Sequence, residues 1–273
     1  VNQQEYSYAG TTVRFINRMA AAVAEVYPDT DIWTLSYQWS RKPTQTEVSD
    51  DVTIMWAFEG CYNHPLNAGE CSAKGIGLQM TGFEPQQNTN YDSYMHGWLE
   101  KADNVWCWYY AQEYLFYLCP MPAWDVHRQN YRYLAESGIQ GIYAEGFYGS
   151  DPTEGYGFDR MNVYLLAKLA WNPYMSESEY NAVTEEYLAA AYGSGWRYLR
   201  EYLDLWTAAG NASGCWMGNY NQPQEIVSFE YYSENYAKMC ELFDNAEKYA
   251  DTAEQAELIG KFRCHMEYLA LCA

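Results

Sequence analysis

Basic residues are scarce in this chain. Its 273 residues include 16 lysines and arginines against 36 aspartates and glutamates, and the formal net charge is −20. Proteins that bind nucleic acid usually present a basic face to the phosphate groups, and an anionic membrane surface attracts the same kind of basic cluster. The composition therefore predicts neither a nucleic-acid nor a membrane partner. The acidity indicates mainly a soluble protein whose negative surface charges repel one another.

Several motifs that identify enzyme classes are also absent. The sequence contains no GxSxG, P-loop or GxGxxG pattern, which argues against serine hydrolases, nucleoside triphosphatases and dinucleotide-dependent enzymes. It has no apolar run long enough to cross a bilayer and no signal peptide. The first residues are VNQQE, without Met, which is consistent with a processed or truncated piece. The residues therefore leave both a cytoplasmic and an exported location open.

Cysteine spacing does not indicate a metal site. The eight cysteines are scattered, and no pair has the CxxC spacing of a zinc ribbon. Cys61, His64 and Cys71 are thiol and imidazole groups of the kind that bind zinc. They are only three, however, and their spacing is irregular. We therefore predict no metal and no cofactor, and a disulfide or a loop-packing role remains open for these cysteines.

Aromatic residues, by contrast, are abundant. The chain contains 29 Tyr, 11 Trp and 9 Phe. Tyr and Trp combine a flat apolar face with a polar edge, which suits the C–H faces and hydroxyl groups of sugars. The alternative interpretation is a core and surface rich in tyrosine that bind no ligand. The sugar interpretation is favoured where aromatic residues gather at the ends of strands.

Hydrophobic periodicity predicts two parts of different character. The first part alternates helices with strands that are almost continuously apolar, which is typical of a parallel sheet with helical crossovers. After Gly157 five helices follow one another, and from about residue 173 we predict an all-helical bundle. The elements expected in the first part are helices at 11–27, 91–102 and 123–137 and strands at 31–39, 51–58, 103–110 and 138–146.

Carboxylates stand at the ends of these predicted strands. Chemistry in parallel α/β folds collects at the C-terminal ends of strands, because the loops there converge on one face. Glu59 follows the second strand, Glu113 lies beyond the third, and Glu145 lies at the end of the fourth. Two carboxylates that flank a sugar can act as general acid and as base or nucleophile. We predict Glu145 and Glu59 as catalytic; the alternative for each is a solvated loop acid or a partner for an arginine.

Other side chains near the strand ends are predicted to bind the sugar. Arg41 suits a substrate carboxylate, because a planar guanidinium can bind one bidentately. His64 suits a sugar hydroxyl group. The predicted substrate-binding residues are Tyr37, Trp39, Arg41, Trp56, His64, Trp108, Tyr110 and Tyr148.

Several stretches together resemble a bacterial family called domain of unknown function 4838. They are RFINRMAAAVAEVYPDTDIWTLSYQWSRKP, CYNHPLNAGEC, YLCPMP, GIYAEG, and YLLAKLAWNP with AAYG, in the family's order and spacing over roughly residues 1–195. The resemblance implies a (β/α)8 barrel related to alpha-glucuronidases and hexosaminidase-like glycoside hydrolases. We therefore expect the C-terminal half of a TIM-barrel-like domain over residues 1–172 and a helical domain over residues 173–273.

The resemblance also implies a carbohydrate partner, including glycans that contain a uronic acid. It places VNQQE on the family's fourth barrel strand, which usually ends in an acid, so Glu5 is a third catalytic candidate by resemblance alone. The third strand in this part typically reads Trp-Asp-Tyr, whereas this chain has Tyr109 between Trp108 and Tyr110. One acid that the family places near the sugar is therefore missing.

Four strands leave a barrel incomplete. They cannot close an eight-stranded barrel, so an edge of the sheet would stay open. We expect an upstream half-barrel or a second copy of the chain to cover that edge. The alternative function is a non-catalytic carbohydrate-binding protein, or a self-assembling structural protein, derived from such a barrel. Paired carboxylates on one face would favour the enzyme, and an isolated glutamate would favour the binder.

Overall fold

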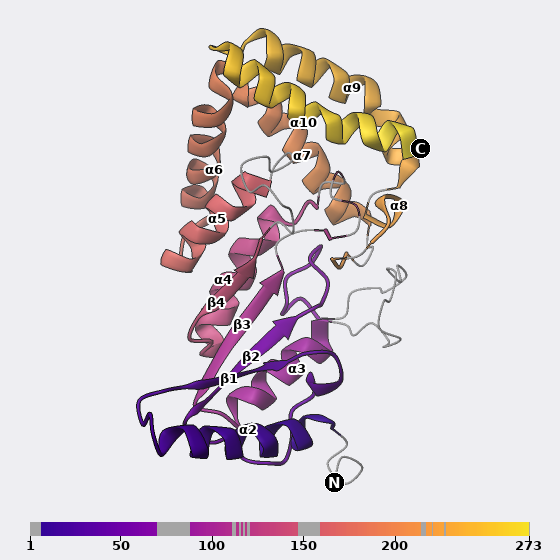
Figure 1. Cartoon of the computed structure of the whole chain (residues 1–273). Helices are drawn as coiled ribbons and strands as arrows, with labels where there is room; N and C mark the ends of the chain where they lie inside the picture. Colours follow the sequence, from indigo (N-terminus) through magenta and orange to yellow (C-terminus); the bar gives the residue numbers. More distant parts are fainter. Residues whose placement is uncertain are drawn as a thin grey trace.

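The computed structural model describes most of the chain (Figure 1). The described residues are 7–69, 88–110, 113–114, 116, 118, 121–146, 159–213, 217–219, 221–226 and 228–272.

A four-stranded parallel sheet forms the centre of the first part. Its strands are β1 (Ile32–Ser36), β2 (Val52–Phe58), β3 (Asn104–Tyr110) and β4 (Ile142–Glu145), and their order in space is their order in the sequence. This confirms the predicted α/β class with parallel strands. In this sheet β1 and β4 are the edge strands.

Helices precede, connect and follow the strands. They are α2 (Ala9–Ala24) before β1, α3 (Asn88–Leu99) between β2 and β3, α4 (Trp124–Ser137) between β3 and β4, and α5 (Asp159–Trp171) after β4. The predicted alternation is therefore confirmed, with boundaries that move by a few residues. At the end of α4, Gly138 has a φ of 101°, in the left-handed region that glycine adopts without a steric cost.

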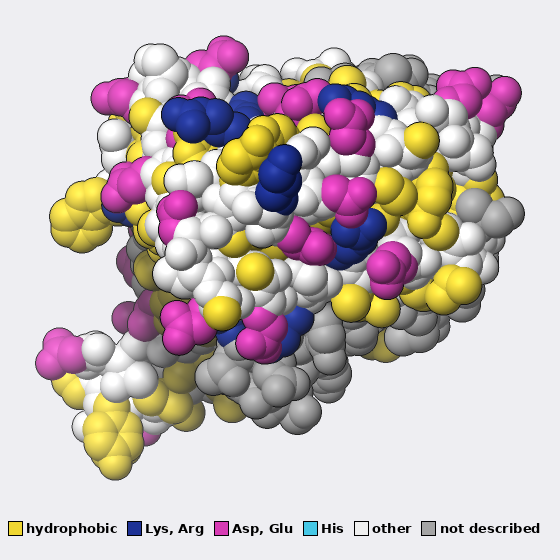
Figure 2. Space-filling model, turned by 90° about the horizontal axis from the view of Figure 1, so that it is seen from above, with side chains coloured by type: hydrophobic (Ala, Val, Ile, Leu, Met, Phe, Trp, Pro, Cys, Tyr) yellow, Lys and Arg dark blue, Asp and Glu magenta, His cyan; other side chains and the backbone are white. Residues whose placement is uncertain are grey.

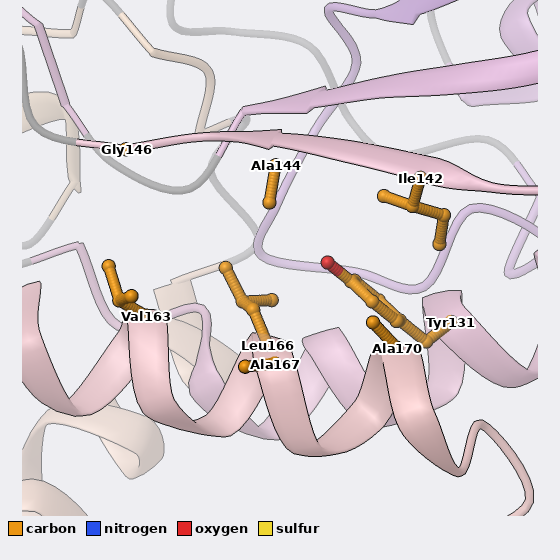
Figure 3. A pocket seen from close by; sticks show the side chains of 8 residues that line it. All are labelled: Tyr131, Ile142, Ala144, Gly146, Val163, Leu166, Ala167 and Ala170. Carbon is orange, nitrogen blue, oxygen red and sulfur yellow. The ribbon is translucent and has the colours of Figure 1, made fainter.

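All four helices lie on the same face of the sheet. Side chains alternate between the two faces of a strand, so the contacts of each strand with its helix identify the covered face. Residues that pack together or line the same gap are Thr34 with Val13 of α2, Trp56 with Tyr91 of α3, Tyr109 with His127 of α4, and Ile142 with Leu166 of α5. Figure 3 shows the last of these gaps, an apolar space of about 180 Å³ between β4 and α5.

The other face of the sheet, called the open face below, carries Trp33, Leu35, Trp106, Trp108 and Tyr143. Trp33, Leu35 and Tyr143 are 45%, 44% and 49% exposed. Trp33 meets Trp106 edge-on with ring centroids 4.9 Å apart, and Trp108 contacts Tyr143 at 4.4 Å. Parallel sheets are normally covered on both faces. Within the described ranges the open face has no covering layer of helices.

The second part is helical, as predicted. Its helices stack beyond the C-terminal ends of the strands (Figure 1). At the start of α6, Ser176 and Glu179 form a capping box that satisfies backbone N–H groups of the first turn. A short helix, α8, was not predicted. The helices are α6 (Glu177–Tyr192), α7 (Trp196–Ser213), α8 (Pro223–Ile226), α9 (Phe229–Lys248) and α10 (Ala253–Cys272).

The segment before α8 attaches the helical part to the ends of β2 and β3. The backbone N–H of Tyr62 donates to the carbonyl of Met217 at 2.7 Å. Glu113 is only 2% exposed, and its two carboxylate oxygens accept the backbone N–H groups of Asn221 at 2.8 Å and Phe116 at 3.3 Å. Glu113 therefore holds two backbone segments together, so it is not a sugar-facing acid.

Charges on the helical part are interspersed. Figure 2, which looks onto this part, shows acidic side chains spread among basic and apolar ones. Arg263, for example, lies 2.6 Å from Asp244 and 3.4 Å from Glu247. The strong net negative charge therefore does not gather in a single acidic patch on the face that Figure 2 shows.

Neither a membrane span nor a metal cluster is found in the described part of the chain. No described helix is long and apolar enough to cross a bilayer, and no group of three or more described His, Cys, Asp or Glu side chains is arranged to hold a metal ion. Cys71, Cys119 and Cys215 lie outside the described residues. The described cysteines, all free thiols, are Cys61, Cys107, Cys240, Cys264 and Cys272.

Candidate active site at the carboxyl ends of the strands

Glu145 is the last residue of β4, and its carboxylate is held in place. Its Oε2 accepts a hydrogen bond of 2.6 Å from the indole Nε1 of Trp108. The hydroxyl group of Tyr114 donates to the backbone carbonyl of Glu145 at 3.0 Å. The side chain is half-buried. Glu145 thus combines a fixed orientation with partial access to solvent.

Glu59 follows β2 directly and lies in a different environment. The backbone N–H of Gln38 donates to its carboxylate. Its Oε2 is buried and has no hydrogen-bond partner among the described residues. Burial raises the pKa of Glu59, and the nearby charge of Arg41 opposes that shift only in part. Glu59 is therefore easier to protonate than an ordinary glutamate.

The turn after β1 presents Gln38 to Glu59. Gln38 begins a single 3₁₀ turn, η1 (Gln38–Ser40), with a φ of 47°, which is uncommon for a residue with a side chain. The side chain of Arg41 donates from Nε to the carbonyl of Gln38 at 2.6 Å, and the N–H of Tyr37 donates to Ser40 Oγ at 3.2 Å. These bonds stabilise an unfavourable backbone conformation, which is common at functional sites.

Two tyrosines lie close to both acids. The side chains of Tyr37 and Tyr110 share a hydrogen bond. Burial raises the pKa of each hydroxyl group, and the charges of Glu59 and Glu145 raise it further. Tyr110 pairs in register with Glu145, whereas Tyr37 follows β1. The sheet therefore brings the ends of all four strands together around one pair of hydroxyl groups.

Arg41 is anchored to α3 beside this group. Its guanidinium donates to the hydroxyl of Tyr91 at 3.0 Å, in addition to its bond with Gln38, and it lies 6.0 Å from the centre of the Tyr91 ring. The carbonyl of Arg41 accepts the indole N–H of Trp98 at 3.1 Å. Arg41 is therefore a fixed, half-buried cation, and part of its donor capacity is used inside the protein.

Three other predicted substrate-binding residues differ in how far they are buried. Trp56 is fully buried on the helix-covered face, stacked against Phe58 at 5.8 Å, so the prediction that it contacts a sugar is wrong. Trp39 is 62% exposed on η1. The Nδ1 atom of His64 lies 3.5 Å from the Sγ of Cys61, and burial lowers the pKa of this histidine.

The remaining candidates are Glu5 and Tyr148, and both lie outside the described residues. The structure in turn adds three residues that the sequence analysis did not single out, namely Gln38, Tyr91 and Tyr114. The two tyrosines are part of no motif. The backbone of Gln38 becomes notable only through its conformation, which no residue pattern predicts. These three residues are therefore identified only by the structure.

Position 109, where the resemblance implies an acid, faces the helices. Tyr109 is fully buried, and its hydroxyl lies 2.9 Å from Nδ1 of His127 and accepts a 3.0 Å bond from Asn130. A side chain at this position points away from the open face, where Glu145 lies. The tyrosine therefore removes no carboxylate from the pair formed by Glu59 and Glu145.

Comparison with known proteins gives one match. The model of a family described as a domain of unknown function (DUF4838) matches residues 2–204, which is more than half of the chain. This range contains the whole sheet and extends into α7. Neither a curated protein nor a solved structure matches the chain.

Proposed function

We propose that this chain, which belongs to the DUF4838 family, cleaves glycosidic bonds in a glycan with a pair of carboxyl groups. The observation that carries the proposal is that Glu59 directly follows β2 and that Glu145 ends β4 in register with Tyr110, where both acids raise the pKa of Tyr37 and Tyr110. This supports a site at which the ends of β2 and β4 each contribute one acid beside Tyr37 and Tyr110. Hydrolysis of a glycosidic bond needs such a pair, one group to give a proton and one to act as base or nucleophile.

The surroundings of the pair suit a sugar. Trp108 holds Glu145 and contacts Tyr143, which is 49% exposed, so aromatic surface adjoins the carboxylate. Sugar rings pack on such surfaces through their C–H faces. Arg41 lies close enough to Glu59 to affect its pKa. A fixed cation beside the acid supports a uronic acid as part of the substrate.

We also propose that the sheet is the C-terminal half of a (β/α)8 barrel. Three features support this: the strands are parallel and in sequence order, all four helices lie on one face, and the open face carries partly exposed aromatic side chains. In a closed barrel that face would be the packed interior. An upstream half-barrel or a second copy of the chain would then cover Trp33, Leu35 and Tyr143.

Self-association tests the barrel proposal. If a second copy covers the open face, the chain forms dimers in sedimentation experiments, and Trp33→Arg shifts them to monomers. The control is Trp171→Arg, because Trp171 is 92% exposed at the end of α5 and lies outside the sheet. A monomer that stays soluble at all concentrations argues against a second copy and leaves the upstream half as the covering layer.

A non-catalytic carbohydrate-binding protein is the second candidate. The partial exposure of Trp33 and Tyr143 favours it, because exposed aromatic rings bind sugars without any chemistry. In that case glycans would bind and remain intact, and substitution of Glu145 would leave binding nearly unchanged.

A hydrolysis screen separates the two candidates. The full chain is incubated with aryl glycosides and with uronic-acid oligosaccharides, alongside Glu145→Gln and the control Glu136→Gln, whose side chain forms an exposed ion pair with Arg132. We expect turnover by the wild type and the control. Glu145→Gln should lose at least about 100-fold of that turnover with little change in Tm. Binding without turnover in all three proteins would contradict the enzyme and favour the binder.

A further inference from the structure

We propose that the two carboxyl groups have different, fixed roles, in which Glu59 gives the proton to the glycosidic oxygen and Glu145 acts as the charged carboxylate. This inference rests on the proposed function and deepens it. It is carried by the contacts of each carboxyl group: Glu145 accepts a hydrogen bond from Trp108, whereas Glu59 has a buried oxygen without a donor among the described residues.

Glu145 is provided with a hydrogen-bond donor. The indole N–H of Trp108 can only donate, so its 2.6 Å bond requires an acceptor at Oε2 of Glu145. A bond from a neutral donor to a carboxylate is stronger than one between two neutral groups. The hydroxyl of Tyr114 fixes the backbone of the same residue. The structure therefore supplies a fixed hydrogen-bond donor to the carboxylate of Glu145.

Glu59 is arranged as a neutral acid. An ionised carboxylate carries charge on both oxygens, and burying a charged oxygen without a donor is costly. Oε2 of Glu59 is in that position among the described residues. The backbone of Gln38 favours the ionised form of Glu59, but burial has the larger effect and raises the pKa. A proton on the carboxyl group removes the charge and most of the cost.

The groups that face Glu59 do not reverse this preference. The cation is Arg41, which follows η1, and it favours the anion. Its guanidinium, however, is shared with the carbonyl of Gln38 and the hydroxyl of Tyr91 on α3. Tyr37 and Tyr110, the other titratable neighbours, stay neutral because burial raises the pKa of both. Burial has the largest effect on the pKa of Glu59 and raises it. Glu59 therefore keeps its proton to a higher pH than a solvated glutamate.

The proposed reaction breaks one C–O bond of the sugar and moves one proton to the leaving oxygen. The proton of Glu59 goes to the glycosidic oxygen, which leaves with the electron pair of the broken C–O bond. Glu145 stabilises the positive charge that develops on the sugar ring. Water then gives its hydroxyl group to the anomeric carbon. If water attacks directly, its remaining proton goes to Glu145. If Glu145 has first formed a bond to that carbon, the attack of water breaks this bond and restores the carboxylate of Glu145, and the remaining proton goes back to Glu59.

Leaving groups of different acidity test the assignment. A phenyl glycoside needs a proton on its leaving oxygen, whereas a dinitrophenyl glycoside of the same sugar leaves readily as an anion. Glu59→Gln should lower kcat/KM for the phenyl glycoside about 1,000-fold and that for the dinitrophenyl glycoside less than about 10-fold. Glu145→Gln should lower both by about 1,000-fold or more. Circular dichroism and Tm verify that each variant is folded.

The reverse pattern, or equal losses on both substrates in Glu59→Gln, overturns the assignment while the proposed function stands. If the wild type cleaves no glycoside, the proposed function fails, and infrared titration then tests the assignment without turnover. Difference spectra between wild type and Glu59→Gln should show a carboxyl group that titrates above the range of ordinary glutamates. A normal or lower titration of Glu59 overturns the assignment.

Discussion

The indole N–H of Trp108 reaches across the sheet to the carboxylate of Glu145 at 2.6 Å. Trp108 pairs in register with Tyr143, so Glu145 is its diagonal neighbour on β4, two residues further along the same face. The contact therefore follows from the register of two parallel strands. It joins the aromatic surface of the open face to the residue proposed to carry the negative charge.

Trp108→Phe tests this link. The substitution keeps an aromatic ring but removes the N–H donor, so the carboxylate of Glu145 loses its orientation and part of its stabilisation. We expect kcat to fall about 10-fold to 100-fold, the equivalent of a hydrogen bond of about 1.5–3 kcal/mol to a charged group. Trp106→Phe is the matched control, because Trp106 lies on the same strand and face but contacts Trp33. Equal losses in both variants would contradict the specific role of Trp108.

The hydroxyl pair of Tyr37 and Tyr110 gives a second prediction. Tyr110 is 7% exposed, so Tyr37→Phe leaves a buried hydroxyl without its partner and should cost about 1–3 kcal/mol of unfolding free energy. The double variant Tyr37→Phe/Tyr110→Phe removes both hydroxyl groups and should recover part of that loss. Urea unfolding of the wild type, both single variants and the double variant gives the coupling energy. Strict additivity would show that the two hydroxyl groups do not interact.

The faces of the strands show what sequence patterns predict and what they miss. Periodicity predicted the four strands and their helices, because apolar runs and helical spacing are local signals. It also treated Trp56 and Trp108 as equivalent aromatic residues near strand ends. The register places Trp56 on the helix-covered face and Trp108 on the open face, and an offset of one residue reverses the face. That offset depends on tertiary pairing, which composition and spacing do not contain.

Acids near strand ends are equally ambiguous in a sequence. Glu59, Glu113 and Glu145 lie at or just after the ends of apolar strands, yet their environments differ: Glu59 and Glu145 raise the pKa of Tyr37 and Tyr110, whereas the third acid, Glu113, binds backbone N–H groups. Glu113 accepts a hydrogen bond from Asn221 in the segment before α8. The two residues are 108 positions apart in the sequence. No local pattern reports a contact of that range. The structural role of Glu113 therefore had to come from the packing of the helical part onto the sheet.

Glu113→Ala should consequently affect stability rather than chemistry alone. The substitution leaves the N–H groups of Phe116 and Asn221 without an acceptor in a buried place. We expect the unfolding free energy to fall by about 2–4 kcal/mol. Glu136→Ala, which removes an exposed acid from α4, should change it by less than about 0.5 kcal/mol. Denaturant unfolding measures both, and a near-neutral Glu113→Ala would contradict the structural role.

The buried contact between His127 and Tyr109 predicts how stability depends on pH. Burial lowers the pKa of His127 from 6.5 to about 3. Between these two values the unfolded chain binds a proton that the folded chain does not, so protonation favours unfolding. The contribution of His127 to stability is therefore complete above pH 6.5 and decreases as the pH falls toward 3. Its slope approaches about 1.4 kcal/mol per pH unit.

His127→Gln isolates this effect from the titration of the many acids. A glutamine keeps a side-chain acceptor for the hydroxyl of Tyr109 but has no proton to gain. Urea unfolding at several pH values from 7 to 4.5 should show a steeper loss of stability in the wild type than in the variant. The two curves should converge or cross as the pH falls, because the loss that is specific to His127 grows by up to about 1.4 kcal/mol per unit. Parallel curves over that range would mean that His127 takes up its proton equally in the folded and unfolded chains.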